Sequence, residues 1–320
     1  MKVLRSCAIV LATIIVISSG FYGSVFAETY KPCVISLDGK EVSFISPILN
    51  VDDTVMVPLS EAAEMFNATV TEEVPGHSVK CIKEHMSIDM TIDQDFALVN
   101  GTKTEMPQAF HLIDDTYYVS IRFLAEALGN TVTWKNRTVE ITSGSVVFVG
   151  DSLTHFFDFQ TNFPETNIIN KGVSGNLTFD VIPRVGALKE LKPKKIFLMI
   201  GTNDMWCAIN KNVMLNNYRT ILNTFLNDEP WATIYLESIL PEGQAALDRN
   251  SKSSNAAIDD MNNELKKLAD ELNIQYVDIA SEYKDAQGRM DSQYTTDGIH
   301  LKKEAYCKWT DKVKALVDGN

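Results

Sequence analysis

The sequence has few of the features that mark nucleic-acid-binding proteins, metalloproteins or proteins that span a membrane several times. Its 29 Lys and Arg stand against 42 Asp and Glu, a formal net charge of −13 at pH 7. The only concentration of positive charge is the short run 192–195. Because phosphate contacts depend on clustered Lys and Arg, we expect no nucleic-acid partner, and anionic membrane surfaces are disfavoured for the same reason. No cysteine or histidine spacing matches a zinc site.

Cysteines are also scarce, with 5 in 320 residues. The four that follow residue 27 allow two disulfides in three connectivities, or four thiols: Cys33, Cys81, Cys207 and Cys307. The sequence does not choose a pairing, and in a chain of this size buried or free thiols are the simpler interpretation. No long apolar run occurs except near the N-terminus, so no second membrane-spanning segment is expected.

The first 27 residues have the pattern of a secretory signal peptide. Lys2 and Arg5 precede an apolar run at 8–17, and Val25-Phe26-Ala27 offers small residues at the two positions that a signal peptidase reads. A retained membrane anchor is the alternative, but the run is shorter than the ~20 residues of a spanning helix. We therefore expect cleavage after Ala27 and a secreted or cell-surface protein without a membrane span.

Residues 28–143 predict a β-rich domain with little helix. Short β-branched or alternating runs predict strands at Val34–Leu37, Val42–Ile45, Met86–Ile92 and Thr138–Ile141. The sequence also repeats internally, because residues 57–70 align with residues 119–132 at an offset of 62 without a gap. Each copy has the pattern of a short amphipathic helix that leads into a strand.

This region resembles the copper amine oxidase N-terminal-like domain. The resemblance is carried by Val57-Pro58-Leu59, by Tyr118-Val119-Ser120-Ile121-Arg122, and by the segments 125–129 and 132–134. It implies a non-catalytic module for attachment or substrate presentation. Copper is not implied, since the histidines of this region, His77, His85 and His111, do not cluster as metal ligands do.

From residue 144 to 320 the pattern changes to strands that alternate with amphipathic helices. Strands are predicted at 145–150, 167–170, 195–200, 232–237 and 274–279. Apolar residues at helical spacing lie between them, around 181–191, 213–225 and 258–272. Strands that are apolar on both faces predict a parallel sheet covered on both sides, an α/β fold in three layers. Ligands of such sheets bind at the carboxyl ends of the strands.

Polar motifs follow the first three of these strands and precede the last helix. They are Gly150-Asp151-Ser152, the glycine-containing segment 170–176, Ile200–Asp204 and Thr296–Leu301. Taken singly, each also fits an ordinary helix cap, turn or flexible loop. Asp297 and His300, three residues apart, can place a carboxylate against an imidazole, which would fix its tautomer.

Together, and in this order, the four motifs resemble the SGNH (GDSL-type) hydrolase family over residues 145–317. The resemblance implies a flavodoxin-like three-layer fold. It implies Ser152 as the nucleophile, Asp297 as the orienting acid and His300 as the general base. It further implies an oxyanion hole formed by the backbone N–H groups of Ser152 and Gly175 and the side chain of Asn203. The mechanism that the resemblance implies needs no metal or organic cofactor. The Gly-x-Ser-x-Gly elbow of the other common serine esterase fold is absent around Ser152.

Residues beside these motifs are further candidates for the site. His155 either lines the cleft or lies on a helix surface, and Met205 and Trp206 are candidates for shaping the acyl or alcohol pocket. Three phenylalanines are expected in the core or at the rim: Phe156, Phe157 and Phe159.

The sequence therefore predicts a secreted serine esterase acting on short acyl groups, with acetyl esters favoured. The segment Glu237–Pro241 is similar to the acetylhydrolase-like branch of the family, which favours an acetylated polysaccharide or cell-wall glycan as substrate. Two alternatives are a lysophospholipase or short-chain lipase, and a non-catalytic binding protein of the cell surface.

Overall fold

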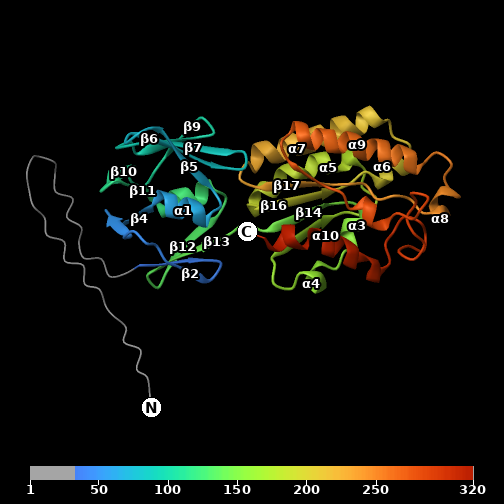
Figure 1. The fold of residues 1–320 in the computed structure, drawn as a ribbon, viewed down its shortest axis with the longest axis horizontal. Coiled ribbons are helices and arrows are strands. Elements are labelled where there is room, and N and C mark those ends of the chain that lie inside the picture. Colours follow the sequence, from blue (N-terminus) through green and yellow to red (C-terminus); the bar gives the residue numbers. More distant parts are fainter. Residues whose placement is uncertain (1–32, 320) are drawn as a thin grey trace, which may run out of the picture.

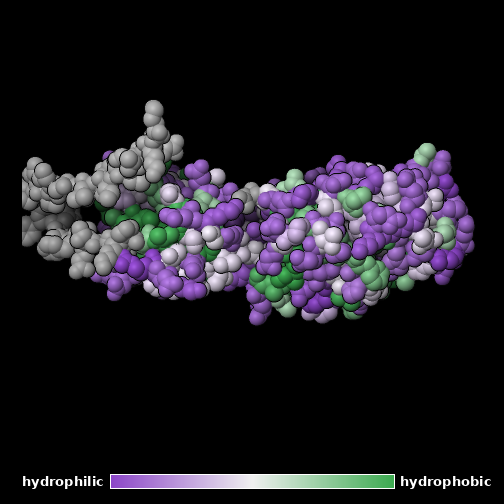
Figure 2. All heavy atoms as spheres, turned by 90° about the horizontal axis from the view of Figure 1, so that it is seen from below, coloured by the Kyte–Doolittle hydropathy of each residue, from purple (hydrophilic) through white to green (hydrophobic). Residues whose placement is uncertain are grey.

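The computed structural model describes residues 33–319, which form a β-rich domain followed by an α/β domain (Figure 1). The predicted signal peptide lies outside the described residues. Within the described part, no helix is both long and apolar enough to cross a membrane. The face of the molecule in Figure 2 is largely hydrophilic, with small separate apolar areas.

The β-rich domain contains three sheets around one apolar core. The first has the order β12-β13-β1-β2, the second β10-β11-β4-β3 and the third β5-β6-β7-β8-β9. Its strands are β1 Val34–Leu37, β2 Lys40–Val42, β3 Leu49–Val51, β4 Thr54–Pro58, β5 Thr69–Val74, β6 Ser78–Lys83, β7 Met86–Thr91, β8 Phe96–Val99, β9 Thr102–Glu105, β10 His111–Ile113, β11 Thr116–Ser120, β12 Thr131–Lys135 and β13 Thr138–Thr142. Buried and partly buried residues alternate along β7, so one face of its sheet packs on the core.

Two short helices connect the sheets. Helix α1 (Leu59–Met65) follows β4, and helix α2 (Ile121–Ala127) follows β11, while β4 and β11 pair antiparallel. The helices end just before Asn67 and Gly129, which both have a left-handed backbone, with φ of 55° and 81°. This conformation turns the chain out of a helix and suits glycine and asparagine. Each helix then leads into a strand, β5 or β12.

The predicted strand Val42–Ile45 is wrong over most of its length, because β2 ends at Val42. The carboxylate of Glu61 accepts hydrogen bonds from the backbone N–H groups of Ile45 (2.5 Å) and Ser46 (3.0 Å). Those donors are therefore not available to a β-ladder, and Ile45 is 97% exposed.

The α/β domain is built on a five-stranded parallel sheet with the order β15-β14-β16-β17-β18. The strands are β14 Val146–Gly150, β15 Ile168–Gly172, β16 Lys195–Met199, β17 Thr233–Glu237 and β18 Gln275–Val277. Every residue of β14 and β16 is buried, as the continuous apolar runs predict. The strand order reverses between β14 and β16, the switch point at which doubly wound sheets bind ligands. The predicted parallel α/β fold is confirmed.

Helices cover both faces of this sheet (Figure 1). One face packs on α5, α7 and α9, and the other on α4, α10 and an aromatic cluster. The helices are α3 Ser152–His155, α4 Phe159–Asn162, α5 Thr178–Val185, α6 Thr202–Trp206, α7 Lys211–Asp228, α8 Gln244–Leu247, α9 Asn255–Glu271 and α10 Tyr306–Asp318, with 3-10 turns η1 Gly186–Leu191, η2 Ala280–Tyr283 and η3 Lys303–Ala305. On the aromatic face, Phe148, Phe197 and Tyr235 stack across three neighbouring strands at 4.4 Å centroid spacing.

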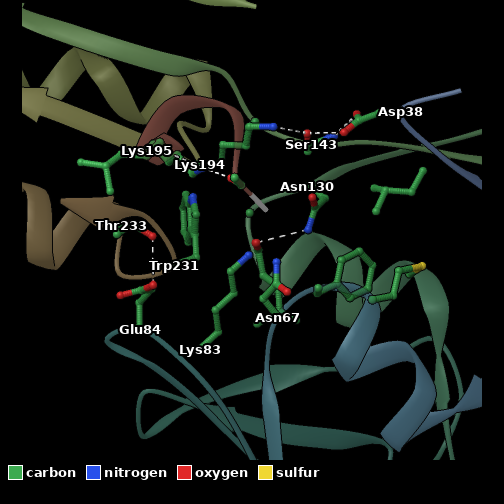
Figure 3. A pocket seen from close by; sticks show the side chains of 18 of the residues that line it. Asp38, Asn67, Lys83, Glu84, Asn130, Ser143, Lys194, Lys195, Trp231 and Thr233 are labelled. Atoms are coloured by element: carbon green, nitrogen blue, oxygen red, sulfur yellow. Dashed lines mark hydrogen bonds between the residues drawn. The ribbon is translucent and has the colours of Figure 1, made fainter. Parts of the chain in front are cut away.

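The β-rich domain contacts the amino edge of the parallel sheet. Glu84 accepts a hydrogen bond from Thr233 at the start of β17 (2.9 Å), and Ser143 accepts one from Lys194 before β16 (3.1 Å) (Figure 3). The Trp231 ring packs against both domain cores, and Gly129 lies so close to this ring that a Cβ there would be 2.2 Å from it. A cavity of about 540 Å³ lies at this boundary and is lined by residues of both domains.

Candidate active site

The opposite, carboxyl edge of the sheet carries the polar motifs. Gly150, at the end of β14, is paired with Gly172 of β15 on one side and with Met199 of β16 on the other. The segments that follow these three strands therefore start at the same edge and contain Ser152, Gly175 and Asn203. The last motif joins them from a turn before α10, although it lies nearly 150 residues from β14 in the chain.

A continuous series of hydrogen bonds links Ser152, His300 and Asp297. The Ser152 hydroxyl lies 3.0 Å from Nε2 of His300, and Nδ1 of the same ring lies 2.7 Å from Oδ2 of Asp297. Ser152 is buried to 7% exposure, while the two partners are partly exposed. The histidine can thus accept the hydroxyl proton on one nitrogen while its other nitrogen donates to a carboxylate.

The turn that contains Asp297 fixes this carboxylate. Its Oδ1 accepts hydrogen bonds from the backbone N–H groups of Ile299 (2.9 Å) and His300 (2.8 Å), which leaves Oδ2 for the imidazole. Burial raises the pKa of the Asp297 carboxyl, but the hydrogen bonds from His300 and the two backbone groups outweigh burial and bring the pKa to about 2. Gly298 adopts a left-handed φ of 84°, and a Cβ there would lie 2.5 Å from the backbone nitrogen of Ala246.

Asp151, directly before Ser152 in the chain, caps the helix that Ser152 begins. Its side chain is fully buried and caps α3 by accepting from the backbone N–H of Leu153 (3.0 Å). Burial raises the pKa of Asp151 to about 6, and the second carboxyl oxygen has no hydrogen-bond partner in the described part of the chain. Gly150 precedes it because the chain is crowded there: a Cβ would lie 2.1 Å from the Thr154 hydroxyl.

The loops after β15 and β16 are tied to each other. The Asn203 amide donates to the carbonyl of Asn176 (2.9 Å), and the buried carboxylate of Asp204 accepts from both the backbone N–H (2.9 Å) and the hydroxyl (2.6 Å) of Thr178. Gly175, on the same loop, has a φ of 82° and open space around its Cα. These bonds link the two segments that contain the candidate oxyanion donors, and both segments follow strands next to β14.

Two exposed aromatic side chains, Phe156 and His155, lie at the rim of the site. Phe156 is 55% exposed and packs edge-on against the His300 ring, with centroids 5.8 Å apart. Phe157 and Phe159 are buried in the aromatic core, as expected. His155 is exposed, and its Nδ1 lies 3.2 Å from the carbonyl oxygen of Gly172.

Trp206 and Arg249 form a second group at this rim. The Arg249 guanidinium lies 5.8 Å from the Trp206 ring centroid and donates to the carbonyl of Asp297 (2.5 Å). The sequence motifs did not predict a role for Arg249, nor the hydrogen bonds by which Asp204 holds Thr178. Asp204 stands inside a recognised motif and could have been found there, whereas Arg249 lies in an unpatterned loop after α8 that carries no signal.

The four described cysteines are all free thiols. Cys81 is buried, Cys33 is half-buried, and Cys207 and Cys307 are exposed. Between residues 33 and 319, no group of three or more Asp, Glu, His or Cys side chains is arranged to hold a metal ion.

Two family models match the chain. Residues 148–307 match the GDSL-like Lipase/Acylhydrolase family, and residues 36–143 match the Copper amine oxidase N-terminal domain. None of the curated proteins matches the chain.

Solved structures resemble the α/β domain. An assigned acylhydrolase of Bacteroides fragilis is 21% identical, with 61% of this chain and 93% of that one covered and a TM-score of 0.50. A GDSL-like lipase from Bacteroides thetaiotaomicron is 21% identical over 55% of this chain and 88% of that one, with a TM-score of 0.49. A protein from Streptococcus pneumonia, assigned as a platelet activating factor, is 29% identical over 55% and 84%, with a TM-score of 0.48.

Proposed function

Because this chain belongs to the GDSL-like lipase/acylhydrolase family, we propose that it is a serine esterase in which Ser152, His300 and Asp297 form the catalytic triad. The observation that carries the proposal is the unbroken path from the Ser152 hydroxyl through both nitrogens of the His300 ring to Asp297, at 3.0 and 2.7 Å. Distances of this size allow proton transfer without rearrangement.

The mechanism follows from these contacts. His300 accepts the proton of Ser152 at Nε2 while the oxygen attacks the ester carbonyl, and Asp297 stabilises the imidazolium that forms. The imidazolium then protonates the leaving alcohol, and an acyl-serine remains. Water attacks the acyl-serine with His300 as base, which releases the acid and restores Ser152.

The negative oxygen of each tetrahedral intermediate needs donors on the side of Ser152 away from His300. We assign this role to the backbone N–H groups of Ser152 and Gly175 and to the Asn203 amide. Asn203 uses one amide hydrogen to bind Asn176, so its second hydrogen is available to substrate. Fixed donors of this kind stabilise developing charge at little reorganisation cost.

We propose a short acyl group, with acetyl favoured, carried on a carbohydrate or cell-wall polymer. The Asn203–Asn176 hydrogen bond and the Asp204–Thr178 pair join the two loops beside Ser152, and a short acyl group requires less separation of these loops than a long one. The segment Glu237–Pro241 does not line this space, since it is buried and Glu237 accepts from the Trp309 indole (2.7 Å).

A lipid ester is the second candidate. Three of the exposed large apolar side chains of the α/β domain follow β14 and β15 at the edge that carries Ser152: Phe156, Val173 and Phe179, exposed by 55%, 42% and 68%. Such side chains could contact an acyl chain or a lipid surface.

Hydrolysis of p-nitrophenyl acetate, butyrate and octanoate by the protein and by Ser152→Ala tests both candidates. The expected result is activity that falls with chain length and is absent from the variant. Activity that rises toward octanoate would favour the lipid ester. Equal rates for protein and variant, or no activity on any ester, would instead favour a non-catalytic binding protein.

We also propose that the protein is exported and that the β-rich domain has a non-catalytic role. Cleavage after Ala27 would release a mature chain with a net charge of −15, because residues 1–27 contain two basic and no acidic residues. N-terminal sequencing of the exported protein tests the cleavage site. We assign the β-rich domain to attachment or substrate presentation, which binding of the isolated region to cell-wall polymers would test.

A further inference from the structure

A cavity of about 380 Å³ has Phe156, a neighbour of His300, in its lining and is not used by the mechanism above. Phe156 connects the two, because its ring packs against His300 and the residue also lines the cavity. The other lining residues come from the segment around α4 and from the start of α10: Asp158, Thr161, Asn162, Lys303, Glu304, Tyr306 and Cys307.

The position of the cavity identifies the part of the substrate that reaches it. His300 returns its proton to the oxygen of the leaving alcohol, whereas the acyl oxygen points toward Gly175 and Asn203. Because Phe156 packs against His300, we infer that the cavity it lines is on the alcohol side of the scissile bond. Its volume, about 380 Å³, is sufficient for a sugar ring.

The lining combines an exposed aromatic ring with charged and polar side chains. The phenyl ring of Phe156 offers an apolar face of the kind on which the C–H face of a sugar can pack. Lys303 is 86% exposed and only loosely paired with Asp158 at 3.9 Å, so its ammonium group can donate to hydroxyl groups. The carboxylates of Asp158 and Glu304 can accept hydrogen bonds from hydroxyls, and they disfavour an anionic lipid headgroup.

We propose that this cavity is a glycan subsite, which binds a sugar ring of the alcohol part of the ester while His300 acts on the neighbouring acylated ring. The inference rests on the proposed esterase function and specifies its substrate class. Phe156 packs on the sugar face, and Lys303 and Glu304 bind its hydroxyl groups.

The two exposed cysteines allow binding at the cavity to be distinguished from binding near Asn203. Cys307 lines the cavity, whereas Cys207 directly follows α6, the helix that carries Asn203. The experiment follows the alkylation of both thiols by N-ethylmaleimide in the full Ser152→Ala chain, by peptide mass spectrometry. The probes are acetylated tetrasaccharides of xylose, glucose and N-acetylglucosamine, with p-nitrophenyl octanoate for comparison.

The expected result is that at least one acetylated tetrasaccharide slows alkylation of Cys307 about tenfold and changes that of Cys207 less than twofold. Protection of Cys207 alone, equal protection of both thiols, protection of Cys307 only by the octanoate ester, or no protection by any tetrasaccharide would each overturn the proposal. Because the readout is binding, it remains decisive even if the protein hydrolyses no ester.

A kinetic comparison tests the role of Phe156 directly. Phe156→Ala should lower the ratio of kcat/KM for the acetylated tetrasaccharide to kcat/KM for p-nitrophenyl acetate about tenfold. Phe179→Ala removes a phenyl group that is more exposed, at 68%, and lies outside the cavity, and this ratio should stay within twofold. Similar ratios in the two variants would refute stacking on Phe156.

Discussion

Replacing Asp297 by asparagine tests the mechanism most sharply, because the two carboxyl oxygens have different tasks. Oδ1 accepts from the backbone N–H groups of Ile299 and His300, and Oδ2 accepts from Nδ1 of His300. An asparagine has only one oxygen. If the amide NH2 faced the backbone, two hydrogen bonds would be lost and their donors left unpaired, at a cost of about 1–3 kcal/mol each.

The amide oxygen of the introduced asparagine should therefore stay with the backbone, and its NH2 should face the imidazole. Nδ1 must then accept a hydrogen bond, so the ring proton moves to Nε2, which faces Ser152. The histidine can no longer take the hydroxyl proton. Substitutions that impose this tautomer in serine hydrolases lower kcat on the order of 10⁴-fold, which corresponds to about 5.4 kcal/mol of activation free energy.

The assay compares kcat for p-nitrophenyl acetate in the protein, in Asp297→Asn and in a matched control. Asp285 offers that control, since its Oδ1 accepts from two backbone N–H groups and its Oδ2 from a side chain, outside the site. Asp285→Asn should retain kcat. A loss below tenfold in Asp297→Asn, with an unchanged melting temperature, would refute the assignment of Asp297 as the group that orients His300.

Three further outcomes are expected. Asn203→Ala should lower kcat for p-nitrophenyl acetate by about 100–1000-fold with little change in KM; an unchanged kcat would remove Asn203 from the oxyanion hole. Asp204→Ala leaves two buried donors of Thr178 unpaired, so denaturant titration should show a free energy of unfolding lower by about 2–6 kcal/mol. Burial raises the pKa of Glu237 to about 8 in the folded protein, from 4.5 for an ordinary glutamate. Between these two pH values the folded protein holds a proton that the unfolded chain releases. The free energy of unfolding therefore falls as pH rises from about 4.5 to 8. Glu237→Gln should show a smaller fall in unfolding free energy between pH 5 and pH 8, and an equal fall would exclude Glu237 as its source.

The α/β domain could be predicted well because its strands are buried on both faces. A run such as Lys195–Met199 is apolar after its first residue and is soon followed by a glycine, so its boundaries are visible without any partner. The same property places Ser152 and Asn203, since each follows such a strand by a few residues. The Asp297–His300 pair could be recognised because both side chains lie within one short turn.

The remaining features depend on contacts between distant segments. Strand β1 pairs in parallel with β13 across about a hundred residues, and no local pattern specifies that register. The end of β2 depends on Glu61, whose carboxylate takes the N–H groups of Ile45 and Ser46. Arg249 reaches Asp297 from an exposed loop, where sequence periodicity is lost.

The contacts between the domains have a consequence for orientation. The β-rich domain contacts the amino edge of the parallel sheet through Glu84 and Ser143, while α3, which begins at Ser152, lies at the carboxyl edge (Figure 1). An enzyme anchored through its β-rich domain would therefore point its cleft away from the anchoring surface.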